Sequence, residues 1–151
     1  MKTILALVDF SDITAKVLAQ TQSLANAFSA RVILVHVIRQ EPVVLDAGLA
    51  SPSIMRSPLE EVIQAGQAKL QQLRDSVAAA GITVTAQQLP DATMASILEA
   101  SRRLEADIIV VGAHHHSALY DLFIGSFTRD LLKLAHCPVL VVPADEGADA
   151  R

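Results

Sequence analysis

The sequence predicts an α/β protein in which helices cover both faces of a single parallel sheet. Five strand-like runs alternate along the chain with four segments of helical periodicity. This alternation is typical of parallel strands joined by right-handed helical crossovers. Hydrophobic residues make up 52% of the chain and aromatic residues only 3%, which fits a doubly wound sheet buried by Val, Ile, Leu and Ala. The 151 residues suffice for one domain, which we place at 1–143, with 144–151 as a C-terminal tail.

The first strand is predicted at residues 3–8, a nearly continuous apolar run that ends at Asp9. Ser11 or Asp12 is expected to cap the following helix. Ligands of open parallel sheets bind at the carboxyl ends of the strands, so Asp9 is placed where a ribose or base could be held. The alternative is that Asp9 only hydrogen-bonds backbone in the turn. The apolar face of the helix comprises Ile13, Val17, Leu24 and Phe28.

The second strand is predicted at residues 31–37, with His36 as a core or rim histidine. Residues 39–57 contain two prolines and a glycine without a clear period, and we interpret them as a flexible flap. A second helix is predicted to begin at Ser57-Pro58 with a capping box and to end at Gly81 in the left-handed conformation. Its apolar face comprises Leu59, Val62, Ile63, Gly66, Leu70, Leu73 and Val77.

The second half of the chain continues the alternation. Residues 82–89 alternate with polar Thr and Gln, as expected of a strand at the edge of the sheet. Asp91 or Thr93 is predicted to start a third helix. Residues 107–111 are mostly apolar and predict a central strand. A fourth helix and a last apolar strand at 139–142 complete the domain.

One stretch of the C-terminal half carries a recognisable motif. Gly112 follows the apolar run, three consecutive histidines stand at 114–116, and Gly125-Ser126 opens the last helix. This pattern resembles the signature of the universal stress protein family, in which glycine, two residues, glycine and nine residues precede Gly-Ser or Gly-Thr. His115 stands where the family has its middle glycine. Residues 4–11, 34–37 and 136–142 are also similar to strands of that family.

The resemblance implies a five-stranded sheet of order 3-2-1-4-5, with the adenine nucleotide α-hydrolase-like fold. It also implies a site for ATP or AMP, with Mg²⁺ beside the phosphates. In that site Asp9 and Val37 would hold the adenosine, and Gly112, His115, Gly125 and Ser126 would surround the phosphates. From the residues alone, Gly112 is equally well explained as a tight turn and Gly125 as a helix start. A side chain at His115 would cost about 1–2 kcal/mol if that position needs a positive φ.

No recognised catalytic constellation is evident, so we predict a non-enzymatic protein with no catalytic residues and no metal ligands. Ser11, Ser117 and Ser126 lack a nucleophile elbow, and no Gly-Lys-Ser/Thr phosphate loop is present. Three adjacent histidines point in different directions and rarely bind one metal ion. Two alternatives stay open: a ligand-free dimeric interaction module, and a hydrolase or metal-dependent enzyme that uses the histidine loop.

Composition limits the partners and the location. The net charge of −4 and the lack of a basic stripe speak against nucleic acid. One cysteine, Cys137, allows no internal disulfide. No signal peptide or membrane span is evident, so we expect a cytoplasmic protein. The apolar edge strand formed by Val139, Leu140, Val141 and Val142 predicts a homodimer. The family resemblance adds regulation of stress survival and of a protein partner such as a transporter.

Overall fold

The computed structural model describes residues 1–38, 58–90, 93–113 and 126–144. Strands and helices alternate along the chain as predicted. The nine elements are β1 (Thr3–Val8), α1 (Thr14–Phe28), β2 (Arg31–Val37), α2 (Pro58–Ala79), β3 (Val84–Leu89), α3 (Met94–Arg103), β4 (Ile108–Ala113), α4 (Ser126–Leu134) and β5 (Val139–Pro143). The predicted flap at 39–57 lies outside the described residues and stays a prediction.

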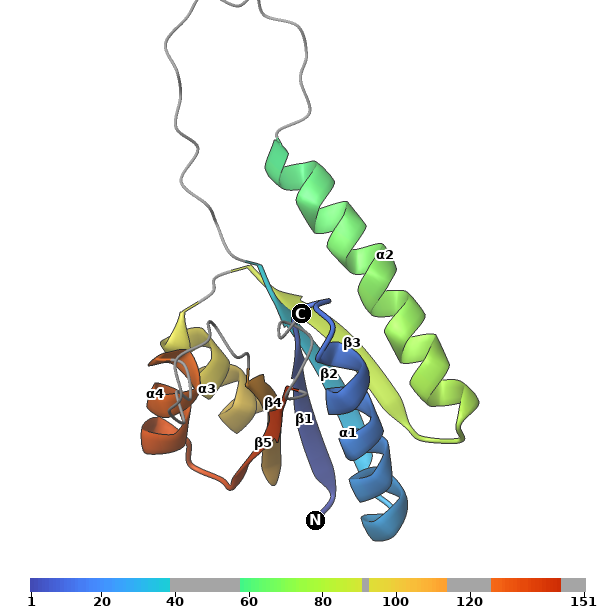
Figure 1. Ribbon diagram of the computed structural model, residues 1–151, viewed down its shortest axis with the longest axis vertical. Coiled ribbons are helices and arrows are strands. Elements are labelled where there is room, and N and C mark those ends of the chain that lie inside the picture. The colour runs from blue at the N-terminus through green and yellow to red at the C-terminus, as the bar shows by residue number, and fades with distance from the viewer. Residues whose placement is uncertain (39–57, 91–92, 114–125, 145–151) are drawn as a thin grey trace, which may run out of the picture.

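The five strands form one parallel sheet in the order β3-β2-β1-β4-β5, which confirms the predicted order. Helices α1 and α2 cover one face, and α3 and α4 cover the other (Figure 1). β1 therefore lies in the middle, between β2 and β4. Its carboxyl end is where the chain order reverses within the sheet, the place at which doubly wound folds bind their ligands.

The continuous apolar character of β1 reflects burial on both faces. Ile4, Ala6 and Val8 pack under α1 and α2, whereas Leu5 and Leu7 pack under α3 and α4. Side chains of a strand alternate between the faces, so a strand covered on both sides needs apolar residues at every position. The sheet thus separates two apolar cores, one on each face.

The helix ends agree with most of the predicted signals. Gly81 has φ +79° and ends α2 in the left-handed conformation. The Thr93 side chain caps α3 by accepting a hydrogen bond from the Ser96 amide at 3.1 Å. The predicted cap of α1 is wrong, because the helix begins at Thr14 after Ile13, which makes no side-chain capping bond. The carboxylate of Asp12 instead accepts a hydrogen bond from the adjacent Ile13 amide at 2.9 Å.

Two apolar residues assigned to buried helix faces are exposed instead. Phe28 is 52% exposed because it ends α1 at the margin of the sheet. Val62 is 54% exposed because the first turns of α2 extend past the sheet (Figure 1). Periodicity identifies the apolar face of a helix but not the residue at which that face stops packing on the sheet.

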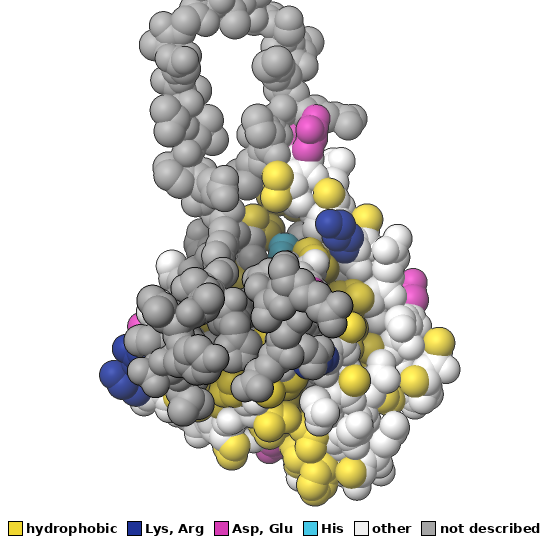
Figure 2. Space-filling model, viewed as in Figure 1, with side chains coloured by type: hydrophobic (Ala, Val, Ile, Leu, Met, Phe, Trp, Pro, Cys, Tyr) yellow, Lys and Arg dark blue, Asp and Glu magenta, His cyan; other side chains and the backbone are white. Residues whose placement is uncertain are grey.

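The basic side chains form no stripe on the visible face of the described residues (Figure 2). On the face shown in Figure 2, the Lys and Arg side chains of the described residues are scattered rather than gathered into a stripe. Within the described part of the chain, no helix combines the length and the apolar character needed to cross a membrane.

Candidate functional site

The candidate site lies at the carboxyl ends of β1, β2 and β4. Asp9 directly follows β1, and Val37 is the last residue of β2. Because the helices run antiparallel to the strands, Ser126 at the start of α4 also lies at this end of the fold. His115 and Gly125 lie outside the described residues. The fold therefore places Asp9, Val37, Gly112 and Ser126 at the same end of the sheet, as the predicted site requires.

Asp9 organises the turn between β1 and α1. Its Oδ1 accepts hydrogen bonds from the Ser11 amide at 3.1 Å, the Ser11 hydroxyl at 2.6 Å and the Thr14 hydroxyl at 3.2 Å. Phe10 between them adopts φ 63°, a left-handed conformation that is unusual for a bulky residue. The hydrogen bonds of Asp9 hold this strained turn, so the predicted structural role of Asp9 is present in the fold.

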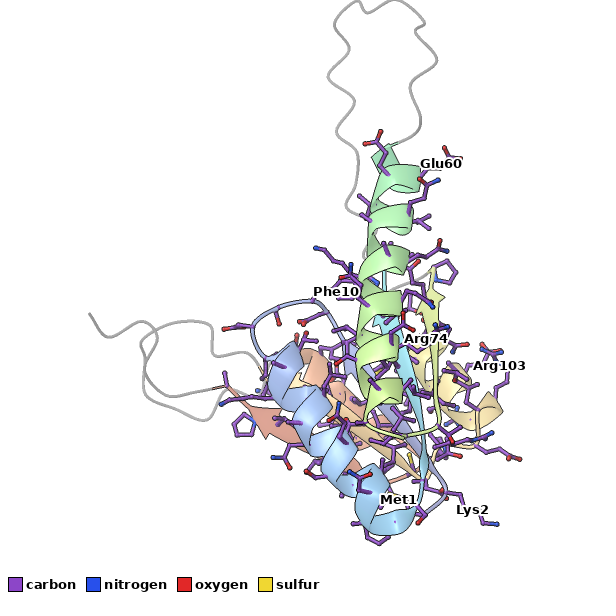
Figure 3. All side chains as sticks on the ribbon, turned by 90° about the vertical axis from the view of Figure 1, so that its right-hand side faces the viewer. Met1, Lys2, Phe10, Glu60, Arg74 and Arg103 are labelled. Atoms are coloured by element: carbon purple, nitrogen blue, oxygen red, sulfur yellow. The ribbon has the colours of Figure 1, made fainter. Side chains whose placement is uncertain are left out.

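The strained conformation of Phe10 directs its ring onto the end of β2. The ring centroids of Phe10 and His36 are 4.2 Å apart, with the planes tilted by 35°. The Lys69 ammonium of α2 lies 5.7 Å from the centre of the Phe10 ring, within the range of a cation–π interaction. Figure 3 shows Phe10 lying beside α2. One aromatic side chain thus connects β1, β2 and α2.

His36 is also held from the side of β3. Its Nδ1 lies 3.3 Å from Nε2 of Gln88, its register partner on that strand. With the amide nitrogen as donor, Nδ1 accepts and the neutral ring carries its proton on Nε2. The Gln88 amide packs so closely against Gly66 of α2 that a β-carbon there would collide with it. Gly66 therefore lets α2 close over the His36–Gln88 pair.

The surroundings of His36 favour its neutral form. Burial lowers the pKa of His36 below its usual 6.5, the Asp9 carboxylate opposes this shift, and the Lys69 ammonium reinforces it. The ring is half-buried at the end of the strand, so the predicted role as a core or rim histidine is confirmed.

Val37 lies one residue beyond the last pair between β1 and β2, which is Val8 with His36. The backbone groups of successive β2 residues face opposite neighbours. The Arg31 amide donates to the carbonyl of Lys2, just before β1, at 2.9 Å. The Val32 and Ile38 amides donate to Thr83 and Leu89 on the β3 side at 2.8 and 3.0 Å. Val37 consequently directs its backbone groups toward the β1 side, one residue past the last pair between the two strands.

Gly112 is needed for space and not for a turn, which corrects the interpretation from the sequence. It lies within β4, paired with Val142 of β5. A β-carbon at Gly112 would lie 2.8 Å from Cγ2 of Ile13, the buried residue just before α1. The absence of a side chain therefore lets the start of α1 rest against the end of β4, beside the candidate site.

Neither the strand ends nor the rest of the described residues contain three His, Cys, Asp or Glu side chains arranged to hold a metal ion. The histidines at 114–116 are not among those residues. Burial raises the pKa of the free Cys137 thiol, which also disfavours a reactive thiolate.

The sequence did not reveal the cluster formed by Phe10, His36, Gly66, Lys69 and Gln88. Gly66 was assigned to the apolar face of its helix, and Gln88 to a polar edge strand. The only local signal is a glycine in the middle of a long helix, which costs about 1 kcal/mol and so requires a packing reason. The other contacts depend on the register of three strands.

An open parallel sheet of this order, covered by helices on both faces, defines a doubly wound α/β protein. The universal stress protein family model matches residues 1–143, and the chain belongs to that family. The chain is similar to a universal stress protein of Thermus aquaticus, with 31% identity over 93% of this chain and 98% of the relative. A universal stress protein of Methanocaldococcus jannaschii is 28% identical over 93% of this chain and 81% of the relative.

Solved structures share the fold. A universal stress protein from Burkholderia pseudomallei superposes with a TM-score of 0.70 at 23% identity and covers 95% of this chain and 96% of its own. Two further family structures are complexes, one with cAMP (TM-score 0.67, 19% identity, 95% and 98% covered) and one from Archaeoglobus fulgidus with dAMP (0.62, 20%, 93% and 96%).

Proposed function

We propose that this protein is a non-enzymatic stress-response protein that binds an adenine nucleotide, ATP or AMP, at the carboxyl ends of β1, β2 and β4. The observation that carries the proposal is the position of Val37, whose backbone faces the space beyond the end of β1. The cAMP and dAMP complexes of two family members with this fold support the choice of an adenine ring.

The residues around that space fit the parts of a nucleotide. The Val37 carbonyl can accept a hydrogen bond from the exocyclic amine of adenine, and Asp9 stands where the ribose would lie. The exposed Ser126 supplies a hydroxyl and a helix amino terminus for the phosphates, an arrangement that favours anions. We assign Gly112, His115 and Gly125 to the phosphate side of the site, where Mg²⁺ would accompany ATP and offset the charge of its phosphates.

The non-enzymatic role rests on the chemistry of the described residues. The candidate site offers Asp9, whose Oδ1 holds the turn, and a histidine whose ring is packed between Phe10 and Gln88. Among the described residues, the site contains no set of a nucleophile, a base and a group that orients the base. Binding, rather than turnover, is the function that this geometry serves.

Calorimetry with adenosine, AMP, ATP and GTP tests the proposal. ATP and AMP should bind and GTP should bind more weakly. Ser126→Ala should weaken ATP binding about threefold to tenfold, through loss of one hydrogen bond, and leave adenosine binding unchanged. Ser23→Ala, on the exposed face of α1, is the control and should leave the affinities for ATP and adenosine unchanged. A protein that binds none of the four ligands would contradict the proposal.

A second proposal, a homodimer through β5, rests on the position of that strand at the edge of the described sheet. Val139, Leu140 and Val141 are only partly buried, and Leu132 and Leu134 of the neighbouring α4 are 44% and 54% exposed. Such an edge favours pairing with a second chain. The dimer would bind a protein partner, such as a transporter.

A further inference from the structure

His36 and Gln88 form a side-chain pair that makes none of the proposed nucleotide contacts. His36 immediately precedes Val37, and Phe10 immediately follows Asp9. The Phe10–His36 stack therefore joins the two strand ends that would hold the adenosine. Whatever shifts His36 also shifts Val37 relative to Asp9.

We propose that the proton on His36 regulates ligand binding, the neutral ring holding the adenosine side of the site in its binding form and the protonated ring releasing it. This regulation rests on the proposed function. His36 would be a positioning residue, because it acts through Val37 and Phe10 rather than by touching the ligand.

The contacts of His36 explain why its proton state matters. Protonation places a hydrogen on Nδ1, which then faces the amide nitrogen of Gln88 at 3.3 Å, donor against donor. Oε1 of Gln88 is buried and has no hydrogen-bond partner among the described residues, so a turned amide could accept from the protonated ring. Because the amide packs against Gly66 of α2, such a turn exchanges its nitrogen for its oxygen at that contact, so the response to protonation reaches α2 as well as β3.

The charges around His36 come from two elements. Asp9 faces it from the connection between β1 and α1 and favours the protonated ring, whereas Lys69 faces it from α2 and opposes a second positive charge. Gln88 of β3 is neutral. Burial and Lys69 together exceed the effect of Asp9, so the binding form with a neutral ring prevails near neutral pH.

Adenosine affinity measured by calorimetry at about pH 8 and about pH 5 tests the proposal. The lower value lies well under 6.5 because burial lowers the pKa of His36 from there. Adenosine is the probe because it has no phosphate that could respond to charge on residues 114–116. The wild-type affinity should fall about threefold to tenfold at the lower pH, the equivalent of one lost hydrogen bond. His36→Phe keeps an aromatic ring but cannot titrate, so its affinity should be the same at both pH values.

Three further variants separate regulation from a structural role. His36→Asn should also abolish the pH dependence, and circular dichroism would verify that it and His36→Phe are folded. Gln88→Glu should move the fall in affinity to higher pH, because a carboxylate favours the protonated ring. His136→Asn, at an exposed histidine near β5, should retain the wild-type pH dependence.

The outcomes distinguish the two proposals. Absence of binding of adenosine, AMP and ATP at pH ~8 would overturn both the proposed function and its regulation. Binding that is equal at both pH values, or that keeps its pH dependence in both His36 variants, would overturn the regulation alone.

Discussion

Gly112 and Ile13 lie so close together that a β-carbon on the glycine would come within 2.8 Å of Cγ2 of the isoleucine. This contact sets the distance between the end of β4 and the start of α1. Both segments border the candidate site, so the packing of an apolar pair sets the spacing of two elements of that site.

Gly112→Ala should therefore destabilise the protein by about 1–3 kcal/mol, the usual cost of an extra methyl group in a packed core. The Cγ2 methyl group of Ile13 cannot move aside easily, because a β-branched side chain is stiff about its first torsion. Urea denaturation of the wild type and the variant measures the change.

A double variant shows whether Ile13 is the obstacle. Ile13→Ala alone should cost about 2–5 kcal/mol because it leaves a cavity. The double variant should lose less unfolding free energy than the two single variants lose together. The shorter side chain at residue 13 leaves room for the new methyl group, and that methyl group partly fills the cavity. Strict additivity would show that the clash is relieved elsewhere. Gly81→Ala is a contrasting control, because its cost comes from φ +79° and not from a neighbour.

The stability of the fold should decrease on mild acidification because of His36. Its folded-state pKa lies below the unfolded value of 6.5, so the unfolded chain binds the proton more readily. The contribution of the neutral ring is complete above pH 6.5 and is lost as the pH falls from there through the folded-state pKa. Denaturation at a series of pH values should show this loss, and His36→Phe should reduce it.

Asp107 should contribute stability over a different pH range. Its Oδ2 accepts the Lys2 and Thr3 amides at 2.6 and 2.9 Å and so joins the start of β1 to the residue before β4. These bonds lower the pKa of Asp107 below 3.8, so its contribution is present above that pH and is lost as the pH falls through the folded-state value. Asp107→Asn should speed hydrogen exchange at Lys2 and Thr3 at neutral pH. Asp130→Asn, on an exposed part of α4, should not.

The proposed dimer can be tested without disturbing the sheet. The Ala144 amide donates to Ala113 at 3.2 Å, so even-numbered residues of β5 face β4 and the Val141 amide faces outward. Val141→Pro removes only this outward amide hydrogen. Pro143, at the equivalent outward position two residues later, already lacks one. Light scattering should find a wild-type dimer and a monomeric Val141→Pro variant.

The matched control lies on the opposite edge of the sheet. By the same alternation the Ala86 amide of β3 faces away from β2, so Ala86→Pro removes an outward donor there. This variant should remain a dimer. A wild-type protein that is monomeric at micromolar concentration, or a dimer that tolerates Val141→Pro, would count against pairing through β5.

His115 should weaken ATP binding at neutral and higher pH. A side chain at the family's middle glycine position adds volume near the phosphates and costs about 1–2 kcal/mol if φ is positive, roughly a tenfold loss of affinity. His115→Gly should therefore bind ATP more tightly at pH ~8. The difference should narrow at pH ~6, where protonated histidines attract phosphate. Calorimetry decides this, and equal affinities at pH ~8 would show that the histidine is not the obstacle.

The sequence by itself determined the alternation of strands and helices and the end of the sheet at which Asp9 lies. The strand at residues 3–8 and its terminal aspartate were identified correctly because burial on both faces leaves an uninterrupted apolar run. Gly81 and Thr93 were identified because the ends of a helix place local demands on single residues. The sheet order came from the resemblance of the glycine motif and the strand segments to a known family.

Only the tertiary structure decided what the individual residues at the strand ends do. Gly112 serves close packing against Ile13, a partner 99 positions earlier in the chain, so no local pattern could separate that role from a turn. The contacts of His36 with Phe10 and Gln88 depend on the register of β1, β2 and β3 and on α2 closing over Gly66. Periodicity records which face a residue occupies, whereas a site is made by the neighbours that the register and the helix packing bring to that face.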